Sequence, residues 1–154
     1  MNILFKHLLG SVSFVNVHYV RPVFKKRKSI NTPTQAVELI RSICDPDALC
    51  LKEYSWVILL SKENHLIGVS QICVGDFNSV MIDVREIAQL ALLTNASSIV
   101  FAHSHTSDYD RPSESDIQIT KRIKNGLALL DVATQDHIIL THSSFFSFRN
   151  NEMI

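Results

Sequence analysis

The chain has 154 residues, of which 46% are hydrophobic and 19% charged, values typical of a globular domain with a single core. Lysine plus arginine and aspartate plus glutamate number 15 each, so the zero net charge gives no general case for nucleic-acid binding. No run reaches the ~18 apolar residues of a membrane span. Three cysteines without a C-x-x-C pair indicate reduced thiols, so we expect a cytoplasmic protein.

The first clear pattern is a strand at residues 12–23, where β-branched and aromatic residues alternate with polar ones. A basic run at residues 25–28 follows, which we interpret as a solvated loop. We treat residues 1–29 as an extension of a single domain that spans residues 1–154.

A helix and a hairpin come next. Thr32 is typical of an N-cap and Pro33 of a first helical residue, and the apolar periodicity predicts a helix that ends near Asp45. Residues 51–61 hold a near-continuous apolar run, which predicts a strand covered on both faces. Residues 66–74 follow a polar turn and predict the return strand.

The second half alternates strands and helices. We predict a short extended segment at 80–84, a helix at 85–94, a strand at 97–102, a helix at 113–130 and a strand at 137–141. This order predicts an α/β fold in which helices sandwich a mixed sheet.

The last aromatic residues, Phe146 and Phe148, have strand spacing and predict one more extended segment on a single face. No internal repeat is present in the chain.

Two histidines follow the strand at 97–102, and an acid lies near the start of the next helix. His103 and His105 are two apart, so in an extended chain both point the same way, and Asp116 can reach the same place. Two imidazoles and a carboxylate suit zinc and leave a fourth position open for water. Each part also has a simpler interpretation, because an H-x-H pair is usually polar surface and Ser113 with Asp116 is typical of a helix cap.

The full pattern H-x-H-x7-S-x-x-D resembles the motif of JAMM (MPN-plus) metalloprotease domains. The segments HSHTSDYDRPSESD and DHIIL resemble, more narrowly, the RadC family of bacterial proteins, and the similarity runs from about Ile30 to the C-terminus. The resemblance implies a layout like that of cytidine deaminase, Zn²⁺ held by His103, His105 and Asp116, and hydrolysis of a peptide or isopeptide bond. It also implies that Ser113 donates a hydrogen bond to the oxyanion.

A JAMM enzyme further requires an upstream glutamate as general base. Alignment by eye puts Gln71 at this position, and an amide does not accept a proton at neutral pH. Glu86 and Glu114 are other acids, but both are typical of solvated residues at helix starts. We therefore expect slow hydrolysis, if any, and an increase in rate on Gln71→Glu.

Three functions remain open from the sequence. The first is a zinc hydrolase acting on a protein or peptide substrate. The second is a catalytically inactive, metal-retaining module that binds a protein partner, which Gln71 favours. The third is an accessory role in DNA repair, the traditional label of the RadC family. Residues 1–50 show no helix-hairpin-helix pattern, so direct binding to nucleic acid is not expected, and the oligomeric state stays open. We interpret His137 and His142 as structural.

Overall fold

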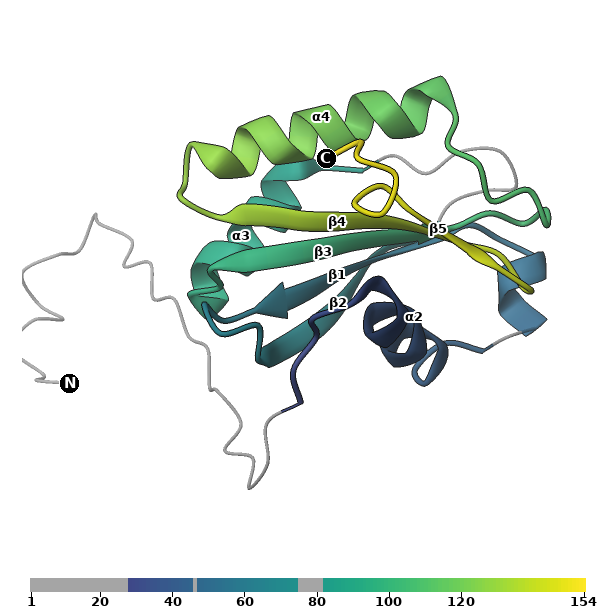
Figure 1. The fold of residues 1–154 in the computed structure, drawn as a ribbon, viewed down its shortest axis with the longest axis horizontal. Helices are drawn as coiled ribbons and strands as arrows, with labels where there is room; N and C mark the ends of the chain where they lie inside the picture. The colour runs from purple at the N-terminus through teal and green to yellow at the C-terminus, as the bar shows by residue number, and fades with distance from the viewer. Residues whose placement is uncertain (1–27, 46, 75–81) are drawn as a thin grey trace, which may run out of the picture.

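A computed structural model describes residues 28–45, 47–74 and 82–154 (Figure 1). The predicted strand at 12–23 and most of the basic run lie outside these residues. In the described part of the chain, five strands form one sheet in the order β2-β1-β3-β4-β5. Their bounds are β1 Tyr54–Leu60, β2 Leu66–Val74, β3 Ser98–Ser104, β4 Ala133–Leu140 and β5 Phe145–Ser147.

The sheet is mixed, as the sequence predicted. β1 pairs antiparallel with β2 and with β3, β3 pairs parallel with β4, and β4 pairs antiparallel with β5. β3 is therefore the central strand, and all of its residues are buried. The parallel pair requires a crossover, which the helix between β3 and β4 supplies.

Helices cover both faces of this sheet, which confirms the predicted α/β sandwich. They are α2 Pro33–Arg41, α3 Val84–Thr94 and α4 Glu114–Ala128, and a short 3-10 helix spans Asp47–Cys50. In Figure 1, α4 lies above the sheet and α2 below it. No helix in the described ranges is both long and apolar enough to cross a membrane.

The core has one part on each face of the sheet. The α2 side contains Trp56, Ile58, Val100 and Ile138, with Ile40 of the helix. The α3 and α4 side contains other members of the same strands together with residues of both helices: Val57, Leu59, Ile99, Phe101, Ile87, Ala91, Ile123 and Leu127. Alternate residues of β1 and β3 thus enter opposite cores, which explains the unbroken apolar runs at residues 56–60 and 99–102.

Helix α4 tolerates a glycine in its interior. A Cβ atom at Gly126 would lie 3.2 Å from Val84 Cγ1, so the missing side chain lets α3 and α4 approach closely. This contact offsets the low helix propensity of glycine.

Two sequence predictions need correction. Val84 is the first residue of α3 and not part of an extended segment, because the Asp83 side chain accepts a hydrogen bond from Arg85 N–H and caps the helix; residues 80 and 81 lie outside the described ranges. β4 begins at Ala133 and not at His137. Its polar first half hides the strand in the sequence, but pairing with β3 holds it extended.

The candidate metal centre

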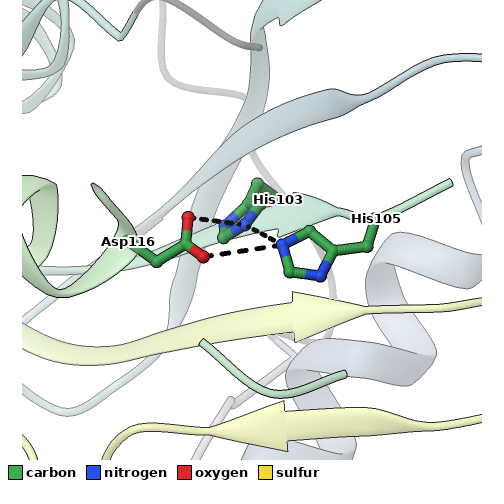
Figure 2. A group of neighbouring side chains, drawn as sticks. All are labelled: His103, His105 and Asp116. Carbon is green, nitrogen blue, oxygen red and sulfur yellow. Dashed lines mark hydrogen bonds and ion pairs between the residues drawn. The ribbon is translucent and has the colours of Figure 1, made fainter. Parts of the chain in front are cut away.

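Strand β3 carries the two histidines to one end of the sheet. The strand continues through Ser104, two residues further than predicted, and His103 follows Phe101 on the face that α3 and α4 cover. His105 lies directly after the strand, and its N–H donates to the carbonyl oxygen of Leu140 at 2.8 Å. This bond continues the β3–β4 pairing and keeps the backbone extended, so His105 points to the same side as His103 (Figure 2).

Asp116 reaches the same place from the first turn of α4. Ser113 is the N-cap and forms a capping box with Asp116, so each accepts a hydrogen bond from the backbone N–H of the other. The Ser113 hydroxyl also donates to Asp116 Oδ2 at 2.6 Å. The capping interpretation and the ligand interpretation are therefore compatible.

The three side chains converge. His103 Nε2 lies 3.1 Å from His105 Nε2 and 3.2 Å from Asp116 Oδ1, and His105 Nε2 lies 3.6 Å from Asp116 Oδ2. Figure 2 shows the carboxylate facing both rings. One ligand atom from each residue fits within a mutual separation of 4.8 Å, so the group could hold a metal ion.

The other ring nitrogens are occupied by protein atoms. His103 Nδ1 lies 2.7 Å from Nε2 of His137, and His105 Nδ1 lies 2.9 Å from the carbonyl oxygen of Tyr109. A carbonyl only accepts, so His105 Nδ1 carries a proton, and in the neutral ring the lone pair is on Nε2. The lone pair therefore points into the group, as metal binding requires.

The electrostatics favour an ionised carboxylate. Partial burial opposes the charged form of Asp116, but the His103 and His105 rings that face the carboxylate, together with the hydrogen bond from the Ser113 hydroxyl, outweigh it and hold the pKa of Asp116 well below its usual range. Partial burial also opposes the charged form of His105, but the facing Asp116 carboxylate and the Tyr109 carbonyl, both of which favour the protonated ring, raise the pKa of His105 overall. Asp116 is thus a ready anionic ligand at neutral pH.

Glu53 is a member of this region that the sequence analysis missed. Ser55 pairs with His103, and the N–H of Tyr54 donates to Ser104 Oγ at 2.9 Å. Glu53 directly precedes β1 at this end of the sheet, close enough to His103, His105 and Asp116 for their charges to affect its pKa. Glu53 and Ser55 are two apart and face the same side of the extended chain. Burial raises the pKa of the Glu53 carboxyl, and the nearby charges of His103 and His105 partly offset this effect.

A signal for Glu53 existed in the sequence. It is an acid that directly precedes the apolar run of β1, and the structure pairs this strand with β3. Antiparallel pairing brings the start of one strand beside the end of the other, which is where the histidines lie.

The structure does not bring Gln71 into this group. Gln71 is exposed on β2 and pairs with Trp56, a member of the α2-side core, so its side chain leaves the sheet on the face away from His103. Glu114 is exposed and accepts a hydrogen bond from Gln118 at 3.3 Å, and it is not part of the ligand group.

Two further residues considered in the sequence analysis are also not part of the ligand group. Glu86 is in the first turn of α3 and exposed, and His142 is exposed in the turn after β4.

Comparison with known proteins decides the family. The family described as "RadC-like JAB domain" matches residues 30–153 of this sequence. The chain belongs to this family. The RadC-like JAB domain thus includes β1, the H-x-H strand and all of α4, and the α/β fold agrees with the layout expected for it.

Curated relatives of this RadC-like JAB domain are UPF0758 proteins. One from Desulfitobacterium hafniense is 30% identical over 95% of this chain, and one from Neisseria meningitidis serogroup B is 33% identical over 92%. A third, from Flavobacterium johnsoniae, is 36% identical over 62% of the chain. The first two alignments cover 60% and 65% of the relatives' own lengths, so this sequence corresponds to part of each.

Proposed function

We propose that this protein is a zinc-dependent hydrolase that cleaves a peptide or isopeptide bond in a protein or peptide substrate. The observation that carries the proposal is the convergence of His103, His105 and Asp116 with a fourth side chain, the acidic Glu53, close by. Membership of the RadC-like JAB family supports it, since the ligand pattern is that of JAMM metalloproteases.

The spacing of the three ligand atoms suits tetrahedral zinc. Ligand atoms about 2.0–2.1 Å from a tetrahedral zinc ion lie about 3.3–3.4 Å from one another. His103 Nε2 lies 3.1 Å from His105 Nε2 and 3.2 Å from Asp116 Oδ1, both close to that value, while His105 Nε2 lies 3.6 Å from the other carboxylate oxygen, Oδ2. When bound, zinc would supply an acidified water and a polarised substrate carbonyl.

Glu53 is the best candidate for the general base. It lies close enough to His103, His105 and Asp116 to interact with them electrostatically, so its carboxylate can accept the proton of the attacking water and pass it to the leaving amine. Partial burial, which raises its pKa, makes it a better proton acceptor than a fully solvated glutamate. An acid in this place removes the reason for preferring an inactive module, which rested on Gln71.

Ser113 has two possible roles at this site. Its hydroxyl now donates to Asp116 Oδ2 and so holds the ligand. Donation to an oxyanion would require the hydroxyl to rotate away from Asp116, which an exposed N-cap serine can do.

The ligand set is tested by metal analysis of the purified protein. We expect about one zinc per chain, and we expect His103→Ala and Asp116→Ala to lose it, because two remaining ligands do not complete a catalytic zinc site. Full zinc occupancy in both variants would show that the ligand set is wrong.

The base is tested by a matched pair of variants. Glu53→Gln keeps the shape of the side chain and removes the proton acceptor, so zinc content should persist while hydrolysis of a panel of peptides and isopeptide-linked proteins falls by ~10²–10⁴-fold. Gln71→Glu adds a carboxylate on the far face and should leave both zinc content and rate unchanged. A chelated sample gives the background rate.

Three other outcomes of these experiments would contradict the proposed mechanism. Undiminished cleavage by Glu53→Gln would exclude Glu53 as the base, and a faster Gln71→Glu enzyme would restore Gln71 to that position. A zinc-loaded natural protein that cleaves nothing in the panel would favour the non-catalytic, partner-binding module.

A further inference from the structure

A buried chain of hydrogen bonds lies behind His103. His137, on β4, is fully buried, and its Nε2 lies 2.7 Å from His103 Nδ1. On its other side, His137 Nδ1 lies 2.6 Å from the hydroxyl oxygen of Thr120, and that hydroxyl donates to the main-chain oxygen of Asp116. The chain therefore starts at one candidate ligand and ends at the backbone of another.

The protons in this chain can be assigned one after another. The carbonyl of Asp116 only accepts, so the single proton of the Thr120 hydroxyl points to it, and the hydroxyl oxygen must accept from His137 Nδ1–H. A neutral His137 that carries its proton on Nδ1 has its lone pair on Nε2 and accepts from His103 Nδ1–H. The lone pair of His103 is then on Nε2, the atom that faces Asp116 and His105.

The surroundings of His137 favour the neutral ring. Its ring stacks on Phe148 with centroids 4.5 Å apart and contacts Phe101 at 4.6 Å. A charged imidazole would be poorly solvated between these rings. It would also donate to His103 Nδ1 and force the His103 proton onto Nε2, where it would block a metal.

We propose that His137 and Thr120 are positioning residues that fix the tautomer and orientation of His103, and through it the affinity of the site for a divalent metal. The inference rests on the proposed metal site. It gives His137, which the sequence analysis interpreted as structural, a specific task. Partners that hold a ligating histidine through its other nitrogen typically contribute 10–100-fold to metal affinity.

The first experiment compares two threonine variants. Thr120→Val keeps the shape of the side chain and removes the hydroxyl, so Zn²⁺ affinity, measured by competition with a chromophoric chelator, should fall about 10–100-fold. Thr94→Val is the matched control, because the Thr94 hydroxyl also donates to a carbonyl four residues earlier, that of Leu90, at the far end of α3. The control should bind Zn²⁺ as the natural protein does.

The second experiment tests whether His137 acts as a hydrogen-bond acceptor for His103 or only by packing. His137→Phe keeps an aromatic ring but offers no acceptor to His103, so we expect it to weaken Zn²⁺ binding. His137→Gln can present an oxygen near the place of Nε2 and should recover part of the affinity. The visible spectrum of the Co²⁺-loaded proteins should change for His137→Phe and less for His137→Gln, a difference that a purely structural role would not produce.

The third measurement needs only the natural, metal-free protein. Long-range ¹H–¹⁵N spectra of the imidazole rings report which nitrogen holds the proton, and we expect Nδ1–H for both His103 and His137. A proton on Nε2 of His103 would overturn the proposal, as would unchanged Zn²⁺ affinity in Thr120→Val. Because the tautomer is read without metal or substrate, failure of the proposed hydrolase function and failure of this proposal remain distinguishable.

Discussion

Asp136 is a buried carboxylate whose contacts lie away from the metal ligands. The Ser147 hydroxyl donates to its Oδ2 at 2.7 Å, and the Arg149 N–H donates to its Oδ1 at 2.9 Å. Burial raises the pKa of Asp136 in spite of these bonds. An acid with a raised folded-state pKa stabilises the fold most below its unfolded-state pKa, about 3.9 for aspartate, and loses that contribution as the pH rises through the folded-state value.

Asp136→Asn should therefore stabilise the protein at pH 7. The amide can still accept from Arg149 N–H and can donate to Ser147 Oγ, while the cost of a buried charge disappears. Because asparagine does not titrate, the gain should shrink towards pH 4. Urea unfolding of both proteins at the two pH values, followed by Trp56 fluorescence, tests this, and a gain that is equal at pH 4 and pH 7 would contradict it.

The ligands were predictable at the residue scale because they are close in sequence. His103, His105 and Asp116 lie at the ends of a predicted strand and a predicted helix, so their spacing alone indicates a shared site. Glu53 and His137 come from β1 and β4 and meet the site only through strand pairing. The sequence pattern specifies neither the neighbours of a strand nor their register, and the base position was therefore assigned to Gln71.

At the scale of elements, capping residues predicted the helix starts well, whereas a strand with polar residues was poorly predicted. Thr32 and Ser113 both cap helices, as their sequence context indicated, and each forms a capping box. The hairpin of β1 and β2 followed from apolar runs on either side of a polar turn. The first half of β4 could not be predicted, because its extended form comes from the β3 backbone beside it rather than from its own residues.

The two caps make a matched pair for testing. Thr32→Ala and Ser113→Ala should each lower the free energy of unfolding by about 0.5–2 kcal/mol, the usual cost of losing an N-cap side chain. Only Ser113→Ala should also weaken Zn²⁺ binding, because only the Ser113 hydroxyl holds a candidate ligand. Thermal unfolding and chelator competition measure the two effects, and equal loss of Zn²⁺ affinity in both variants would indicate a global effect of stability.

At the scale of the whole described fold, one sheet separates two cores, and only one of them lies on the side of the metal ligands. The ligands come from β3 and α4, whereas α2 packs on the other face and supplies none of them. A metal held by both elements would therefore tie α4 to the sheet. A ligand that binds only the closed arrangement opposes opening by RT ln(1 + [L]/Kd), which is about 2.7 kcal/mol at a concentration of 100 Kd.

This asymmetry has a consequence for amide hydrogen exchange. Opening that detaches α4 from β3 breaks the metal site, so Zn²⁺ should slow exchange of the α4 amides by up to about 100-fold at that concentration. Opening of α2 alone leaves the ligands in place, so its amides should exchange at nearly the same rate with and without metal. Exchange followed by mass spectrometry on both forms measures the two helices in one sample. Equal slowing of α2 and α4 would mean that the two faces open only together, as a single cooperative unit, and the metal would then protect the whole sheet and not one side of it.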